Sequence, residues 1–325
     1  MAAPRVLVIR GGAIGDFILT LPAIRLLREN IPGCHLEVLG YPGICELAVT
    51  AGVADATRSL GHRHMAPLFA PGAPVQQEIV DYLLSFNLVV SYLFDPDGHF
   101  RGNLERLGVK TLIECPHRIL PGQGPAAAQL ARPLEKLAFF LDDPAPCFPL
   151  PEGLPTPATP ADFTWHPGSG SVSKTWPMDN WLAVLTELAR DSARHVIVVT
   201  GEAEEERGLL LHLRSFSHPG LTLEFWHQPP LPSLVPRFQA LASTGTKFLG
   251  HDSGISHLAA ACGLPCTLLF GPTDPALWAP QNTGVKVISS PTDKIADLSL
   301  SQVLEAILNP CAPGSPVVSP PPAAR

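Results

Sequence analysis

The sequence lacks cysteine pairs of the C-x-x-C type. Its seven cysteines are scattered over 325 residues, none forms a C-x-x-C pair, and their number is odd. A disulfide framework and a structural zinc site both require thiols at short, regular spacing. We therefore expect a reduced chain in which cysteines pack as small apolar residues.

Long apolar runs and blocks of like charge are also missing. No window of about 18 residues is both apolar and uncharged, so no segment is expected to span a membrane. The amino terminus is interrupted by Arg10 and Asp16 and lacks the order of a signal peptide. The net charge is −7 without a basic stripe, so nucleic acid is not an expected partner. We expect a cytoplasmic protein whose contact with a membrane-borne substrate is peripheral, at the inner face of the inner membrane.

Strand and helix signals alternate along the chain. This alternation is typical of α/β proteins, in which helices connect the strands of a parallel sheet. A proline-rich stretch at 142–160 cannot hold a regular element and marks a domain boundary. The length suits two domains, at 1–150 and 160–308, followed by a tail at 309–325 that is expected to be disordered.

The pattern predicts the bounds of the individual elements. Expected strands are residues 5–10, 35–39, 56–60, 88–94, 111–114, 162–165, 195–200, 222–226, 247–250, 266–270 and 285–289. Expected helices are 16–30 (kinked at Pro22), 43–49, 75–85, 126–141, 178–191, 203–214, 234–242, 255–262 and 301–308. Residues 61–74, which contain His62 and His64, are interpreted as a surface loop.

The densest chemistry lies in residues 247–275. A strand is followed by Asp252-Ser253-Gly254 as a turn and helix cap, with His257 on the first turn of the helix. Free N–H groups from residue 251 to 256, the Ser253 hydroxyl and the helix dipole together are suited to a phosphate. The alternative is an ordinary capped helix in which Asp252 is the cap and His257 is packed inside.

Two further loops of the second half follow strands. In residues 166–177, Ser169 and Ser171 can donate to phosphate oxygens and Lys174 supplies a positive charge. The alternative is a glycine- and serine-rich linker. In residues 201–207, one of the glutamates can hold ribose hydroxyls, while the others favour the start of a helix.

The first loop of the chain, Gly11 to Asp16, is glycine-rich but incomplete as a dinucleotide fingerprint. Arg10 occupies the place of the first glycine in G-x-G-x-x-G, and Glu37, a candidate for binding ribose, lies inside its strand. A dehydrogenase is therefore disfavoured. Asp16 is either a helix cap or a general base. Asp95-Pro96-Asp97 is interpreted as a turn, and no metal site and no cofactor are predicted.

Together these stretches resemble glycosyltransferase family 9, the ADP-heptose:lipopolysaccharide heptosyltransferases and their relatives. The resemblance is carried by VLVIRGGAIGDFILTLPAIRLLR, HPGSGSVSKTWPMDNW and FLGHDSGISHLAAACGLPCTLLFGPTDP, in this order. It implies a GT-B fold, in which two Rossmann-like domains face each other across a cleft. The first domain would bind the acceptor and the second the nucleotide sugar, for an inverting transfer without a metal.

The resemblance also implies roles for individual residues. Asp16 would be the catalytic base and Lys174 would neutralise the donor diphosphate. The remaining donor-binding residues would be Ser169, Ser171, Glu204 (less surely Glu205), Asp252, Ser253, Gly254 and His257, and the acceptor-side loop would include Gly12 and Gly15.

The sequence departs from the family in its first half. After the fourth expected strand the chain has SYLFDPDGHF where the family typically has a DLQG-like turn. The amino-terminal loop is GGAIGD, whereas the family has a serine-rich version. Two hypotheses remain. The first is a transferase that moves a heptose or related sugar from an ADP-linked donor to a lipopolysaccharide-core or similar glycan. The second is a non-catalytic relative that binds nucleotide sugars.

Overall fold

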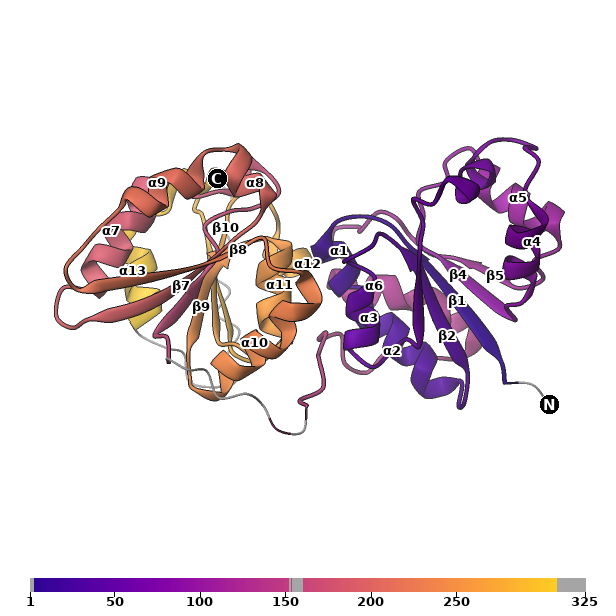
Figure 1. The fold of residues 1–325 in the computed structure, drawn as a ribbon, viewed down its shortest axis with the longest axis horizontal. Helices are drawn as coiled ribbons and strands as arrows, with labels where there is room; N and C mark the ends of the chain where they lie inside the picture. Colours follow the sequence, from indigo (N-terminus) through magenta and orange to yellow (C-terminus); the bar gives the residue numbers. More distant parts are fainter. Residues whose placement is uncertain (1–2, 152, 154–159, 309–325) are drawn as a thin grey trace. The chain divides into compact units, whose positions relative to one another are not determined.

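The computed structural model describes residues 3–151, 153 and 160–308. The chain divides into two compact units, Met1–Pro149 and Leu150–Arg325. Each unit is built on its own parallel sheet (Figure 1). The expected α/β fold class, with a parallel sheet in each of two domains, is confirmed.

The first unit contains a five-stranded parallel sheet in the order β3-β2-β1-β4-β5. The strands are β1 (Arg5–Arg10), β2 (His35–Gly40), β3 (Ala56–Ser59), β4 (Leu88–Ser91) and β5 (Leu112–Glu114). The central strand, β1, pairs with β2 from Arg5↔His35 to Arg10↔Gly40 and with β4 from Val6↔Leu88 to Ile9↔Ser91. Because all strands run in one direction, the loops after β1, β2 and β4 lie at the same edge of the sheet.

Helices cover both faces of this sheet (Figure 1). They are α1 (Ile14–Ile18), α2 (Leu21–Asn30), α3 (Glu46–Thr50), α4 (Gln77–Leu84), α5 (His99–Leu107) and α6 (Ala126–Ala131), with 3₁₀ helices at Arg63–Phe69 and Arg132–Leu137. On one face, α4, α5 and the first 3₁₀ helix pack against the apolar strand residues Leu7, Ile9, Leu39 and Val89. This buried layer fixes the sheet that carries the β1 loop.

Several expected helices differ from those observed. Residues 16–30 form two helices, and Pro22 lies in the first turn of α2, where its missing N–H leaves no hydrogen bond unmade. The expected helix at 203–214 is likewise two helices, separated by Gly208 with φ of 70°. Within the expected loop at 61–74, residues 63–69 form a 3₁₀ helix, and α5 was not expected at all.

The second unit contains a six-stranded parallel sheet in the order β11-β10-β9-β6-β7-β8. The strands are β6 (Phe163–Trp165), β7 (Arg194–Thr200), β8 (Leu221–His227), β9 (Lys247–His251), β10 (Cys266–Phe270) and β11 (Val285–Ser289). From the centre, β6 to β8 run outward on one side and β9 to β11 on the other. The loops after β6 and β9 therefore meet where the strand order reverses, which is where open α/β sheets bind ligands.

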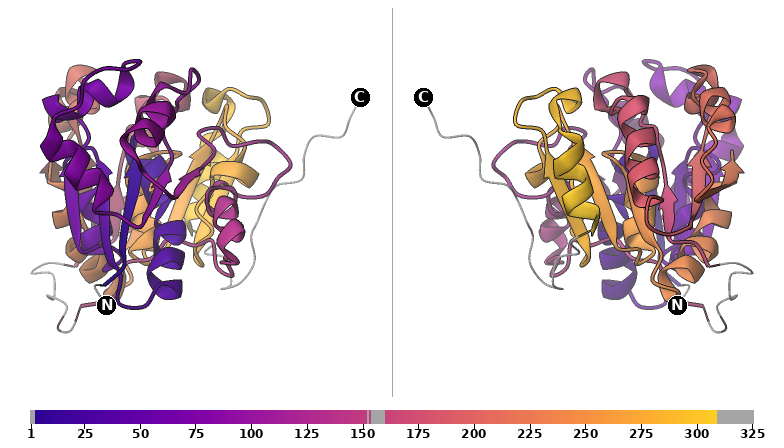
Figure 2. Two further views of the ribbon diagram at one scale, coloured as in Figure 1. Left: turned by 90° about the vertical axis from the view of Figure 1, so that its right-hand side faces the viewer. Right: turned by 90° about the vertical axis from the view of Figure 1, so that its left-hand side faces the viewer.

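The helices of the second unit also lie on both faces. They are α7 (Met178–Leu188), α8 (Glu202–Glu206), α9 (Leu209–Ser215), α10 (Leu231–Ser243), α11 (Gly254–Ala261), α12 (Pro275–Trp278) and α13 (Leu300–Leu308), with 3₁₀ helices at Val172–Lys174 and Ile295–Asp297. Helices α7 and α13 lie side by side on one face (Figure 2), over a core that includes Trp165, Trp176 and Trp181. This rigid layer lies directly beneath the loop after β6.

The segment that joins the two units contains no helix or strand in its described part, residues 142–151, 153 and 160. The division between the units falls within it, after Pro149. The expected tail at 309–325 lies outside the described residues. None of the helices in the described part of the chain is long and apolar enough to cross a membrane.

Candidate functional site

The turn from β9 into α11 presents the amino terminus of a helix at the carboxyl edge of the second sheet. Ser253 is the cap residue, and its hydroxyl accepts the N–H of Ser256 at 3.3 Å. The hydroxyl of Ser256 donates in turn to the carbonyl of His251 at 2.6 Å. The first N–H groups of α11, starting at Gly254, therefore point toward the edge of the sheet together with the positive end of the helix dipole.

Asp252 is the centre of a polar cluster beside this helix end. Its Oδ2 atom accepts from Nζ of Lys174 at 2.7 Å and from the hydroxyl of Thr273 at 2.8 Å, and Nε2 of His257 lies 3.9 Å from its Oδ1. Burial pushes the pKa of Asp252 upward, but the contacts with His257 and Lys174 outweigh it and lower the pKa to about 2. The cluster thus holds a buried, ionised carboxylate and brings together Lys174, Asp252 and His257, as expected, with Thr273 as an unexpected member.

The glycine- and serine-rich loop after β6 is fastened to the same turn. The hydroxyl of Ser169, which is 3% exposed, donates to the carbonyl of Asp252 at 2.9 Å. Nη1 of Arg207 donates to the carbonyl of Ser169 at 2.8 Å. The hydroxyl of Ser171, by contrast, bonds to that of Ser173 at 2.8 Å. The loop is therefore held in place by Ser169 and Arg207; Ser171 lies at its surface, whereas Lys174 reaches back to Asp252.

His251 has a different place from the one expected. Residues 251–256 were expected to form a loop that presents N–H groups to a ligand, but His251 is the last residue of β9 and has no exposed surface. Its Nε2 atom accepts the backbone N–H of Trp176 at 2.9 Å and the indole N–H of Trp181 at 3.1 Å. Nδ1 must then carry the proton, and it lies 3.3 Å from the carbonyl of Gly168. His251 therefore supports the loop from below.

The buried His251 should make the stability of the second unit depend on pH. Burial lowers the pKa of His251 to about 3, below the ordinary value of 6.5, although the Gly168 carbonyl opposes this. The unfolded chain therefore binds a proton between these values that the folded chain does not, so stability falls as the pH drops from 6.5 toward 3. Urea unfolding followed by tryptophan fluorescence should show this loss, of several kcal/mol, and His251→Gln should flatten it. Parallel pH profiles of the two proteins would contradict the assignment.

His257 faces inward from the first turn of α11. Its side chain is 4% exposed, and its Nδ1 atom is buried without a hydrogen-bond partner in the described part of the chain. Buried polar atoms are nearly always paired in native proteins, so this nitrogen remains available for one further hydrogen bond.

The two glutamates considered for ribose binding differ in exposure. Glu204 is 2% exposed, and its Oε2 accepts the N–H of Gly201 at 2.7 Å. The side chain of Glu205 is 56% exposed, and its Oε2 accepts from Gln228 at 2.7 Å and lies 3.3 Å from Nε2 of His227. Glu204 therefore caps α8 from inside, whereas Glu205 lies at the surface.

The loop after β1 carries the remaining expected residues. Asp16 lies in the first turn of α1, and its Oδ2 accepts the N–H of Ala13 at 3.2 Å. Its side chain nevertheless remains 41% exposed. Gly12 has a φ of 99°, which favours glycine, and Gly15 lies within α1. Asp16 is thus both a cap and an accessible carboxylate.

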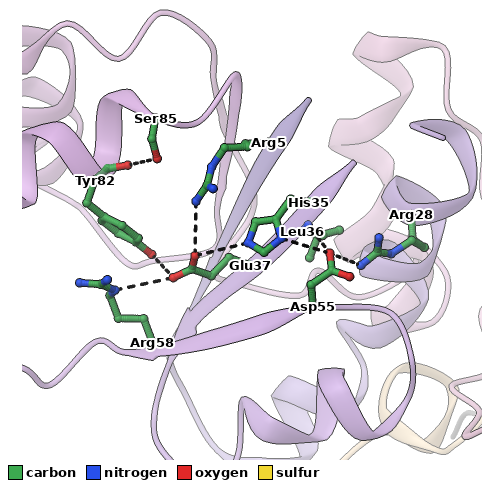
Figure 3. A network of polar contacts seen from close by, with 9 residues as sticks. All are labelled: Arg5, Arg28, His35, Leu36, Glu37, Asp55, Arg58, Tyr82 and Ser85. Carbon is green, nitrogen blue, oxygen red and sulfur yellow. Dashed lines mark hydrogen bonds and ion pairs between the residues drawn. The ribbon is translucent and has the colours of Figure 1, made fainter. Parts of the chain in front are cut away.

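Glu37, the residue that would have bound ribose in a dehydrogenase, belongs to a separate network (Figure 3). Its Oε1 accepts from the hydroxyl of Tyr82 at 2.7 Å, and both Arg58 and Arg5 lie within 4 Å of its carboxylate. Only 7% of Glu37 is exposed. The residue neutralises neighbouring arginines inside the first unit and is not free to bind a nucleotide.

Asp95 and the histidine pair have structural partners. The carboxylate of Asp95 accepts the N–H groups of Phe100 and Arg101 at 3.1 and 2.8 Å, and so caps α5. The rings of His62 and His64 pack edge to face, with their centroids 4.7 Å apart. Among the residues that the structure describes, no group of three or more His, Cys, Asp or Glu side chains could hold a metal ion.

Comparisons of the sequence with known proteins place the second unit in a family. The model of glycosyltransferase family 9 (heptosyltransferase) matches residues 163–307. Lipopolysaccharide heptosyltransferase 1 of Escherichia coli K12 is 29% identical over 135 residues, which are 41% of this chain and 39% of that protein. The corresponding protein of Salmonella typhimurium LT2 is 21% identical over 333 residues, with 93% of this chain and 99% of that protein covered.

Solved structures match both units. A family 9 glycosyltransferase from Veillonella parvula covers 94% of this chain and 96% of its own, at 16% identity and a TM-score of 0.71. E. coli heptosyltransferase WaaC, solved with ADP, covers 94% of this chain and 99% of its own, at 19% identity and a TM-score of 0.67. The same enzyme was solved with ADP-2-deoxy-2-fluoro heptose. At these identities the likeness shows the fold, which is of the GT-B class. The second unit of this chain therefore carries the match to glycosyltransferase family 9, over residues 163–307.

Proposed function

We propose that this protein transfers a heptose or a related sugar from an ADP-linked donor to a lipopolysaccharide-core or similar glycan, with inversion and without a metal ion. The second unit would bind the donor and the first unit the acceptor. The proposal places the reaction in the cytoplasm, with peripheral contact to an acceptor at the inner face of the membrane. The solved relative that binds ADP-2-deoxy-2-fluoro heptose supports the choice of donor.

The observation that carries the proposal is the cluster of Lys174, Asp252 and His257 at the start of α11. When the sugar leaves its donor, negative charge develops on the diphosphate and must be stabilised. The ammonium of Lys174, the free N–H groups of α11 and the orphan Nδ1 of His257 are all available for this at one edge of the sheet. Asp252 holds Lys174 in place through the 2.7 Å contact.

Asp16 is the proposed general base for the acceptor hydroxyl. In the proposed step the acceptor hydroxyl oxygen forms a bond to the anomeric carbon, and the bond from that carbon to the diphosphate oxygen breaks. The hydroxyl proton passes to the carboxylate of Asp16, and ADP leaves with the electron pair. The exposed fraction of the Asp16 side chain, 41%, leaves the carboxylate accessible to an acceptor hydroxyl.

Calorimetric titration with ADP, UDP and NADH, each with and without a chelator, tests the donor side. We expect ADP to bind preferentially and the chelator to have no effect. Lys174→Ala should weaken ADP binding about 30-fold, because a charge-assisted contact with the diphosphate contributes about 2 kcal/mol. The matched control is Lys294→Ala, an exposed lysine of the same unit, which should bind ADP like the wild type.

The other outcomes decide between the alternatives. A preference for UDP would retain the glycosyltransferase and discard the heptose. Binding of NADH alone would overturn the proposal. ADP binding without any release of ADP from ADP-heptose, over a range of glycan acceptors, would favour the non-catalytic relative.

A further inference from the structure

A buried arginine lies next to Asp16. Arg10 is the last residue of β1, and its side chain is 9% exposed. One of its terminal nitrogens, Nη2, donates to the backbone carbonyl of Asp16 at 3.2 Å and lies 3.9 Å from Oδ1 of the same residue. In the described part of the chain, Asp16 is the one carboxylate with which Arg10 forms an ion pair.

The groups around the guanidinium of Arg10 leave Asp16 as its counter-charge. The guanidinium lies over the ring of Tyr92, 5.7 Å from the ring centre, and the Tyr92 hydroxyl is tied to the carbonyl of Leu130 at 3.0 Å. Cys115 is the other ionisable group nearby. Burial raises the pKa of Tyr92 well above its ordinary value and that of Cys115 to about 12, so both stay neutral at working pH. The positive charge of Arg10 therefore has Asp16 as its counter-charge.

A buried guanidinium at position 10 would destabilise the fold if its role were only structural. A guanidinium removed from water loses hydration that only good pairing restores, yet Nε of Arg10 is buried without a partner among the residues that the structure describes. An apolar side chain would fill the same space more favourably. The charge is therefore expected to serve Asp16, since Nη2 is directed at the carbonyl and the carboxylate of that residue.

We propose that Arg10 is a positioning residue for Asp16, resting on the role proposed for Asp16 as the base. Arg10 draws Oδ1 toward the end of β1 while the Ala13 N–H holds Oδ2, so the plane of the carboxylate is set from both sides. This positioning does not require Arg10 to touch the substrate.

The first test needs no substrate. Melting temperatures are measured for the wild type, Arg10→Met, Asp16→Asn and the double variant. We expect Asp16→Asn to lower the melting temperature by about 3 °C more in the wild type than in Arg10→Met, because only the former is left with an unpaired buried cation. Additive changes would overturn the proposal.

The second test separates positioning from a purely structural pair. The release of ADP from ADP-heptose is followed at varied acceptor concentration, with heptose-deficient lipopolysaccharide as acceptor. In Arg10→Met we expect kcat to fall roughly tenfold while KM stays within about twofold of the wild type, because the carboxylate loses its orientation and both substrates still bind. Arg10→Lys should recover most of the lost kcat, because the charge is retained. Arg5→Met, on the same strand but paired with Glu37, is the matched control and should leave both constants unchanged.

The outcomes separate this inference from the proposed function. Coupled melting with an unchanged kcat in Arg10→Met would show a structural pair and overturn the positioning role. A wild type that releases no ADP would overturn the proposed function and, with it, the role given to Asp16, whatever the melting temperatures.

Discussion

Asp16→Asn is expected to reduce the turnover of ADP-heptose at least about 1000-fold while leaving ADP affinity within about threefold of the wild type. The substitution removes the proton acceptor and retains the shape of the side chain. The amide oxygen of the asparagine can still accept the N–H of Ala13, so the start of α1 should persist. ADP affinity should be unaffected because the residues proposed for the donor all belong to the second unit.

The measurement is the steady-state release of ADP, with calorimetry for ADP binding. Asp81→Asn is a suitable control, since Asp81 lies on α4 of the same unit and its carboxylate accepts from the side-chain amide of Gln77 at 2.8 Å. It should retain full turnover. If Asp16→Asn kept more than about a tenth of the wild-type turnover, Asp16 would be a helix cap and another group would have to act as the base.

Much of the fold could be predicted from local patterns. The strands Arg5–Arg10, Cys266–Phe270 and Val285–Ser289 have the expected bounds. Each is a short apolar run enclosed by glycine, proline or polar residues, and such a run can be recognised as a strand from the sequence alone. Helix bounds were less accurate. Pro22 and Gly208 each divide a periodic stretch, and whether such a residue kinks a helix or starts another depends on packing that the sequence does not display.

The contacts within the candidate site could be predicted from the sequence only in part. The loops around Lys174 and Asp252 stand out by composition, but their contact depends on β6 and β9 being neighbours, across 78 residues of sequence. Thr273 and Arg207 were present in loops of interest, and nothing in the sequence showed that they contact Asp252 and Ser169. The pattern predicts a loop from residue 251 whose backbone N–H groups face a ligand, whereas His251 ends β9 and is the buried acceptor for two tryptophans.

Gly168→Ala is expected to lower ADP affinity about 100-fold and the melting temperature of the protein by about 6 °C. A methyl group at Gly168 would overlap the carboxylate of Glu204 and approach its Cγ to 2.7 Å. Glu204 cannot withdraw freely, because it is buried and accepts the N–H of Gly201. Overpacking of this kind typically costs about 1–3 kcal/mol. Here the displaced backbone is that of the loop which carries Ser169 and Lys174.

Gly170→Ala is the matched control within the same loop. An added methyl group at Gly170 meets nothing within 4 Å, so this variant should bind ADP and melt like the wild type. Equal behaviour of the two alanine variants would show that Glu204 does not constrain the loop.

The double variant Gly168→Ala/Glu204→Ala then decides the role of Glu204. Removal of the glutamate side chain clears the space for the new methyl group, so most of the lost melting temperature should return. If Glu204 holds the ribose, as the family resemblance implies, ADP affinity should remain low after this repair. If affinity returns together with stability, Glu204 is a buried support beneath Gly168. The exposed Glu205, next to His227 and Gln228, would then be the carboxylate available to the ribose.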